Sequence, residues 1–139
     1  MSGRSLDHAG LETLGFEECL RLLASVPLGR IGFVSDGEVR ILPVNHLVDG
    51  QDIVFRTAQG SKLSAARECN PVTFEADAYD ERRHSGWSVV VTGRAEQVDS
   101  DAVIEHLGQR GLLSWVPAAE PYWIRIRPSA VTGRRTPAV

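Results

Sequence analysis

The chain has 139 residues, which favours a single domain that is large enough to bury a hydrophobic core. Its composition, 42% hydrophobic and 24% charged, is ordinary for a globular protein, and the formal net charge of -3 argues against a nucleic-acid-binding protein. No apolar run approaches the ~18 residues that span a bilayer, and the N-terminus lacks a secretory apolar core, so we expect a cytoplasmic protein without a membrane partner.

The N-terminal part of the chain predicts one amphipathic helix. Residues 1–10 show no helical or strand pattern and are expected to be flexible, and residues 11–139 are expected to form one domain. From Leu14 onward the apolar residues recur at helical spacing as far as Val26, and a proline and a glycine then close the helix. We expect the apolar side of this helix to pack on a sheet.

Short apolar runs after this helix predict antiparallel strands. Runs at 30–34, 38–48 and 52–58 are separated by two Asp-Gly turns, which indicates a meander of three strands. Pro43 lies inside the middle run and indicates an edge position, a break or a bulge. A short helix is then predicted to begin near Ser61.

The second half of the chain predicts three more strands and another helix. Alternating runs at 72–79 and 87–98 flank a polar turn, a helical pattern covers 99–111, and a last alternating run covers 122–135. Six strands, mostly joined by hairpins and accompanied by peripheral helices, indicate a mainly β (α+β) fold. We therefore predict a six-stranded antiparallel β-barrel, closed or partly open.

The cysteines and most of the histidines predict no special chemistry. Cys19 and Cys69 have no metal-ligand spacing and are expected to be reduced thiols, and no metal is expected. Three histidines are expected at the surface: His8, His84 and His106. Two tryptophans are expected to pack in the core or between subunits: Trp115 and Trp123.

One short segment combines cations, hydroxyls and a predicted helix start. Arg56 and Thr57 end the third strand, and Ser61 and Lys62, the only lysine of the chain, follow Gly60. Two cationic side chains and the N–H groups of a helix start favour an anion such as a phosphate monoester. The alternative is that Ser61 caps the helix and the charges face water.

The order of these motifs resembles the pyridoxamine 5'-phosphate oxidase-like family of FMN-binding split barrels. The resemblance covers residues 15–135, and its most specific parts are the LPVN strand, the RTAxGSKL turn and the SVVVTGRAE strand. It implies that residues 11–139 form a six-stranded split barrel with peripheral helices. It also implies a homodimer with one FMN in each of two clefts at the subunit interface.

The resemblance further implies which residues bind the cofactor. The flavin phosphate would be held by Arg56, Thr57, Ser61 and Lys62. The isoalloxazine ring would lie along the second strand, at Pro43, Val44 and Asn45. The partner subunit would contribute residues of the fifth and last strands, which here are Trp87, Ser88 and Arg134. His46 is a candidate proton donor beside the ring, and its alternative role is that of a half-buried strand histidine bonded to a neighbour.

These features predict a flavin-dependent oxidoreductase that transfers a hydride or electrons to or from a small organic substrate. The alternative is a non-enzymatic flavin-, F420- or haem-binding carrier or sensor on the same barrel. We do not expect true pyridoxamine-phosphate oxidase activity, because the C-terminal GRRTPAV lacks the Arg/His-containing tail of those enzymes. In addition, His46 stands where a basic residue is typical of them.

Overall fold

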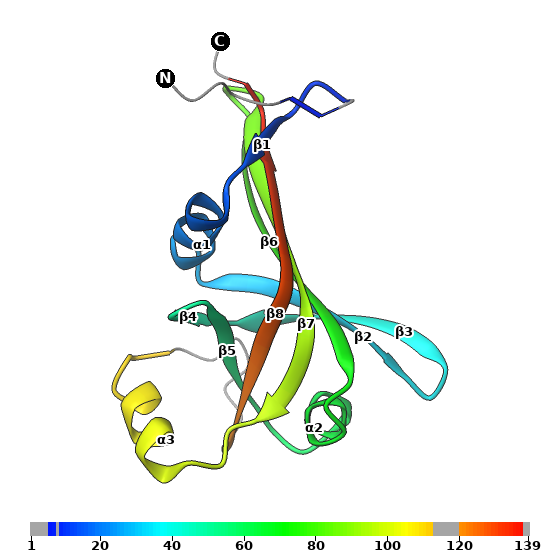
Figure 1. Ribbon diagram of the computed structural model, residues 1–139, viewed down its shortest axis with the longest axis vertical. Coiled ribbons are helices and arrows are strands. Elements are labelled where there is room, and N and C mark those ends of the chain that lie inside the picture. The colour runs from blue at the N-terminus through cyan, green and yellow to red at the C-terminus, as the bar shows by residue number, and fades with distance from the viewer. Residues whose placement is uncertain (1–5, 8, 113–119, 138–139) are drawn as a thin grey trace.

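The computed structural model describes residues 6–7, 9–112 and 120–137 (Figure 1). In chain order, its elements are β1 (Glu12–Leu14), α1 (Phe16–Ala24), β2 (Leu28–Ser35), β3 (Glu38–Asn45), β4 (Leu47–Asp49), β5 (Asp52–Thr57), α2 (Ser61–Arg67), β6 (Pro71–Asp80), β7 (Ser85–Gln97), α3 (Asp101–Gly108) and β8 (Tyr122–Arg135). The strands form one antiparallel sheet in the order β3-β2-β6-β7-β8-β5-β4, with β1 paired to the end of β8. The curled sheet confirms the predicted mainly β barrel architecture.

The sheet has eight described strands, so the predicted number of six was wrong. β1 occupies residues 12–14, where the apolar pattern predicted the helix to begin, because this segment pairs with the far end of β8. β4 is separate because the predicted strand breaks at His46, whose backbone N–H donates to the carbonyl of Pro27. Pro43 causes no break and stays in register with Arg30, and β3 is an edge strand as its proline predicted.

The main core lies inside the half-barrel and beneath α1. Phe55, Phe74 and Ile124 are fully buried in it, together with Cys19 from the apolar side of α1. Gly133 lets this helix lie directly on β8, since a Cβ at that position would be only 2.5 Å from the Cys19 sulfur. The predicted packing of the first helix on a sheet is therefore confirmed.

A second apolar cluster lies between α3 and the other face of β5 and β8. It contains Val54, Val98, Leu107 and Trp123. Trp123 is 5% exposed, which confirms that it packs in the interior. Two other residues named above, His8 and Trp115, lie outside the described ranges.

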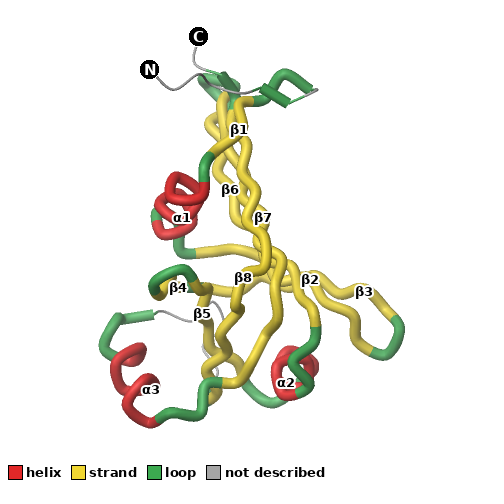
Figure 2. The backbone as a smooth tube through the Cα atoms, in the orientation of Figure 1, coloured by secondary structure: helices red, strands yellow, loops and turns green. Residues whose placement is uncertain are grey.

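Long strands give the molecule an elongated shape. β6, β7 and β8 continue past the barrel as an arm that β1 joins, and the β2–β3 hairpin projects to one side (Figures 1 and 2). None of the three helices in the described ranges has the length and apolar character needed to cross a bilayer. Within the same ranges, no three potential metal ligands come together.

Candidate functional site

One face of the sheet gathers four of the predicted site residues. The outer face is defined as the side of the sheet, over strands β3, β2, β6, β7 and β8, that is turned away from the core. Side chains alternate along a strand and paired residues share a face, so the register assigns Pro43, Asn45, Ser88 and Arg134 to the outer face. Ser88 and Arg134 are direct neighbours across β7 and β8, whereas Pro43 and Asn45 lie at the opposite edge, on β3.

Two predicted site residues point the other way. Val44 is 4% exposed and belongs to the core inside the half-barrel. Trp87 is partly buried and packs against the same core. A ligand on the outer face would therefore meet the backbone of these residues rather than their side chains.

The two residues that end β5 lie on opposite faces of the strand. Arg56 lies on the side covered by α3, where its Nη2 donates to the carbonyl of Leu112 at 2.6 Å and its guanidinium lies 5.3 Å from the centre of the Trp123 ring. Thr57 is 3% exposed, and its hydroxyl donates to the carbonyl of Ala58. The Arg56 side chain thus joins β5 to the segment that follows α3, a contact across 56 residues for which the sequence gives no local signal.

The turn between β5 and α2 depends on glycine. Gly60 is the residue before α2 and has φ 152° and ψ −166°, a conformation that is essentially restricted to glycine. No side chain caps this helix, so the alternative in which Ser61 acts as the cap is wrong; Ser61 is instead the first helical residue. Lys62 is half-buried beside it, and this burial lowers the pKa of its ammonium group while the nearby Glu120 opposes the shift.

His46 is more buried than predicted, with 3% of its surface exposed. Its Nε2 donates to the carbonyl of Leu23 in α1 at 2.8 Å, and its ring meets that of Phe74 edge-on at 4.8 Å. Burial lowers the pKa of His46, although the bond to Leu23 partly opposes this. The neutral ring therefore carries its proton at Nε2 and uses it to hold α1 against the barrel.

A cleft lies between the end of the predicted ring strand and the segment that follows α3. Its volume is about 320 Å³, and its lining includes Asn45, Leu47, the end of α1 and Leu112, whose carbonyl accepts from Arg56. Asn45 is fixed at its rim because its Nδ2 donates to the carbonyl of Pro27 at 3.1 Å. The end of α1 and Leu112 were not among the predicted site residues.

Residues 16–135 match the pyridoxamine 5'-phosphate oxidase family. The chain belongs to this family. A Mycobacterium tuberculosis protein, Rv0080, is 42% identical over 125 residues, which cover 86% of this chain and 81% of that protein. The structure of the FAD binding protein from Mycobacterium smegmatis is 40% identical, with a TM-score of 0.75 over 89% of this chain and 97% of that one.

A FAD-binding protein from Mesorhizobium loti has the same fold, with a TM-score of 0.76 over 91% of this chain and 99% of that one. At 21% identity this similarity concerns the fold alone. The family match and the structural similarities confirm both the resemblance and the split-barrel fold predicted from the sequence.

Proposed function

We propose that this member of the pyridoxamine 5'-phosphate oxidase family binds a flavin nucleotide and is a flavin-dependent oxidoreductase acting on a small organic substrate. The observation that carries the proposal is the 40% identity, over nearly the whole chain, to the FAD binding protein of Mycobacterium smegmatis. This relative favours FAD over the FMN that the sequence predicted. FAD contains FMN as one half, so the residues proposed below apply to either cofactor.

Ser61 and Lys62 are the proposed side-chain ligands of the flavin phosphate. Lys62 fits an anion, because burial lowers the pKa of its half-buried ammonium group and a bound anion would, like the nearby Glu120, oppose that shift. Arg56 donates to the carbonyl of Leu112, which lines the 320 Å³ cleft, and its proposed role is to fix this wall. Thr57 contributes its backbone, because its side chain is buried.

Pro43, Val44 and Asn45 support the isoalloxazine ring in this proposal. The partner subunit of a homodimer supplies Ser88 and Arg134, with Trp87 behind them. Within one subunit, two strands separate β3 from β7, which corresponds to about 14 Å at the usual strand spacing. Asn45 and Ser88 of one chain are therefore too far apart to hold the same ring edge, and this distance supports a cleft shared between two copies.

The bound flavin would supply the hydride or electron transfer, and the chain's own residues would bind and orient it and exclude water. His46 is not proposed as a proton donor, since its only proton lies between Nε2 and the Leu23 carbonyl. Its proposed role is to position the β3–β4 junction beside the ring. Cys19 and Cys69 are free thiols, which is in keeping with the proposed cytoplasmic location.

The absorption spectrum of the purified protein, before and after incubation with FAD, FMN or F420, tests this function. We expect flavin bands that remain with the protein through gel filtration, and tighter binding of FAD than of FMN. A Soret band would instead identify the haem-binding alternative. A colourless protein that retains neither FAD nor FMN would contradict the proposal.

A further inference from the structure

Three charged side chains form a cluster in the middle of the outer face. Arg30 lies on β2, and Glu75 and Asp77 lie on the neighbouring β6. Nη2 of Arg30 is 2.8 Å from Oε1 of Glu75 and 2.6 Å from Oδ1 of Asp77. Nε of Arg30 also donates to Oε1 of Glu75, at 3.0 Å. Two carboxyl groups therefore converge on one guanidinium group, and these three residues are called the outer-face triad.

The outer-face triad holds two carboxyl groups for one cation. If both carboxyl groups are ionised, two negative charges face one positive charge and one negative charge is left over. The side chain of Glu75 is only 28% exposed and that of Arg30 36%, whereas that of Asp77 is 49% exposed. A surplus charge is unfavourable in such a partly buried position, and one proton held between the two carboxyl groups removes it.

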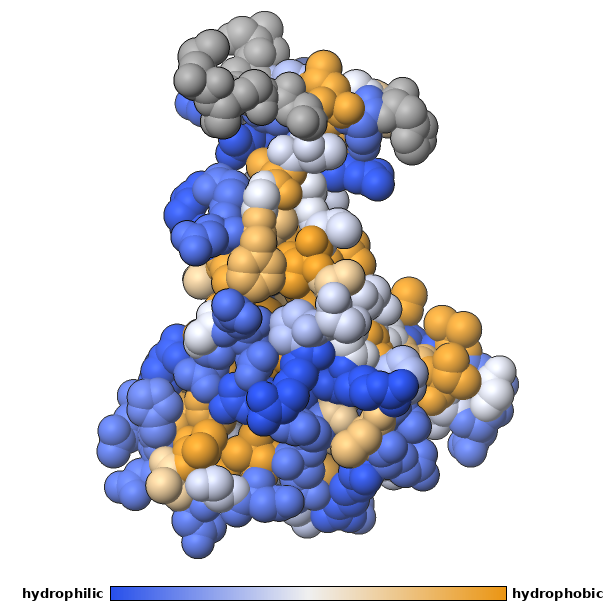
Figure 3. All heavy atoms as spheres, in the orientation of Figure 1, coloured by the Kyte–Doolittle hydropathy of each residue, from blue (hydrophilic) through white to orange (hydrophobic). Residues whose placement is uncertain are grey.

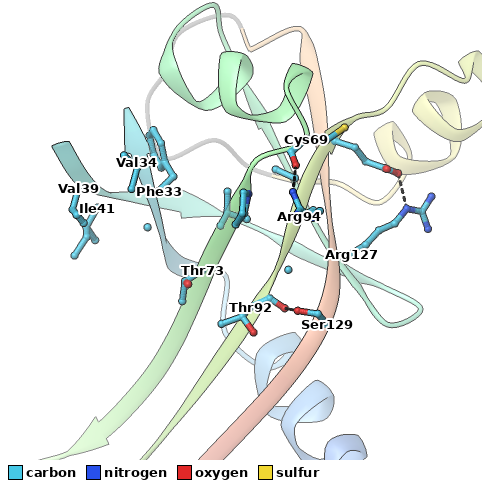
Figure 4. A pocket seen from close by; sticks show the side chains of 16 residues that line it. Phe33, Val34, Val39, Ile41, Cys69, Thr73, Thr92, Arg94, Arg127 and Ser129 are labelled. Carbon is cyan, nitrogen blue, oxygen red and sulfur yellow. Dashed lines mark hydrogen bonds and ion pairs between the residues drawn. The ribbon is translucent and has the colours of Figure 1, made fainter. Parts of the chain in front are cut away.

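The surface beside the outer-face triad is largely apolar. Thr73 precedes Glu75 by two residues on the same face of β6, and it lies in one row of the sheet with Ile41 of β3. Both residues line a groove of about 940 Å³, together with Val34 and Val39 of the β2–β3 hairpin (Figure 4). Figure 3 shows hydrophobic surface where this hairpin projects from the molecule. These surroundings offer little stabilisation to a charge and favour the neutral form of a carboxyl group.

The other strands bring no second cation against the two carboxyl groups within the described residues. Their direct outer-face neighbours on β7 are Val90 and Ser88, and the neighbour of Arg30 on β3 is Pro43. Arg134 on β8 lies two strand spacings, about 10 Å, from Asp77. The charged and titratable groups farther along these strands have partners: Arg134 pairs with Asp7, Arg94 donates to the Cys69 carbonyl, Arg127 pairs with Glu96, and the Tyr79 hydroxyl lies 3.5 Å from His84.

The pKa values of the two carboxyl groups shift in opposite directions. Burial raises the pKa of Glu75 and hydrogen bonding with Asp77 raises it further, whereas Arg30 opposes the shift. The same hydrogen bond, with Glu75, lowers the pKa of Asp77. Both directions place the shared proton on Glu75 and the negative charge on Asp77. Two adjacent carboxyl groups behave in this way when one of them ionises at the expense of the other.

We infer that Glu75 and Asp77 share one proton beside Arg30, and that this pair takes up a proton when the proposed flavin is reduced and releases it on oxidation. The outer-face triad adjoins residues of the proposed cleft, because Arg30 is the cross-strand neighbour of Pro43 and Asp77 that of Ser88. The first part of the inference concerns the chain alone, and only the link to reduction rests on the proposed function.

The proton uptake follows from a balance of charge. Two electrons and a single proton from the electron donor leave one negative charge on a flavin at neutral pH. A new negative charge nearby strengthens the hold of a carboxyl group on a proton. Water supplies this proton at the half-exposed Asp77, Glu75 binds it, and it returns to water when the two electrons leave.

Carbon-13 NMR of the side-chain carboxyl groups of the full-length protein, over about pH 3 to 8, tests the shared proton. We expect the Glu75 signal, assigned by its loss in Glu75→Gln, to titrate above the ordinary pKa of 4.5. Asp77→Asn should lower this titration, because it removes the competing negative charge. Glu38→Gln is the control: this exposed carboxylate shares the side of Ser35, opposite to the outer face, and its loss should change nothing. A Glu75 signal that titrates at or below 4.5 would overturn the inference.

The midpoint potential of FAD bound to the protein, measured against pH with dithionite as the reductant, tests the link to reduction. Above the Glu75 titration, the potential of the wild type and of Glu38→Gln should fall more steeply with pH than that of Glu75→Gln, because the intact pair takes up an additional proton. Equal slopes in all three proteins would overturn the link. A protein that binds no FAD would contradict the proposed function and the link together, and the NMR titration would still decide whether the proton is shared.

Discussion

His46 connects the barrel to α1 through a single hydrogen bond, which its ring donates. Its Nε2 donates to the Leu23 carbonyl, and within the described part of the chain its Nδ1 has no hydrogen-bond partner and no contact with solvent. A second proton on the ring would therefore be buried without an acceptor, which is the physical reason that burial lowers the pKa of this residue.

The free energy of unfolding should therefore depend on pH through His46. The unfolded chain binds a proton near the ordinary pKa of 6.5, whereas the folded chain binds it only at a lower pH. The contribution of neutral His46 is thus complete above about pH 6.5 and is lost as the pH falls below that value. Urea unfolding at pH 5 and pH 7.5 measures the difference.

His46→Gln is the matched variant for this experiment, because a glutamine amide can donate to the Leu23 carbonyl but does not titrate. The free energy of unfolding of this variant should differ less between pH 5 and pH 7.5 than that of the wild type. If the free energy of unfolding changes by the same amount in both proteins, another group causes the pH dependence.

Lys62 is the residue on which the proposed phosphate contact most depends. Replacing it by methionine keeps much of the buried stem and removes the charge, so flavin affinity should fall at least about tenfold while the fold remains. The matched control is Arg83→Met, which removes an exposed cation from the β6–β7 turn and should leave affinity unchanged. Fluorescence titration of each apoprotein with flavin measures the dissociation constants. If Lys62→Met binds flavin as tightly as the wild type, Lys62 is not a ligand of the phosphate.

At the scale of elements, the turn from β5 into α2 requires an unusual backbone. Gly60→Ala introduces a Cβ at φ 152° and should lower the free energy of unfolding by about 1–3 kcal/mol. Gly15→Ala is the control, because Gly15 has φ −75° and nothing lies within 4 Å of an added Cβ. If Gly60→Ala and the wild type have equal free energies of unfolding in urea, the turn accepts the added Cβ without strain.

Most elements could be predicted from the sequence because their signals are local. Apolar periodicity and Asp-Gly turns located six of the eight strands and the three helices. The other two strands arise from contacts that no local pattern contains. Glu12 pairs with Arg135 at the other end of the chain, and the strand break at His46 depends on the distant carbonyl of Pro27.

The family motifs named candidate site residues, but they could not predict the direction of the side chains. Asn45 lines the 320 Å³ cleft, and Lys62 lies at the start of α2. The motifs did not distinguish the faces of the strands, so Val44 and Trp87 were included although both pack toward the core. The role of Arg56 depends on Leu112, which only the tertiary structure brings near.

At the scale of the whole molecule, the proposed flavin and the proposed homodimer are linked. In the proposed cleft, Pro43 and Asn45 on β3 come from one copy, and Ser88 on β7 and Arg134 on β8 come from the other, because β2 and β6 separate β3 from β7 within one sheet. Flavin binding should therefore strengthen the dimer, by the same factor by which dimer formation strengthens flavin binding. Sedimentation velocity with and without FAD measures this coupling, and a dimer constant that is independent of FAD would argue for a cleft within one subunit.

The most direct test of the proposed function is a titration of the refolded apoprotein with FAD, followed by flavin absorbance and fluorescence. We predict saturation at one flavin per chain, that is, two per dimer, with a shift of the flavin bands on binding. If the spectrum of FAD is unchanged and all of the flavin passes through a filter that retains the protein, this chain is not a flavoprotein.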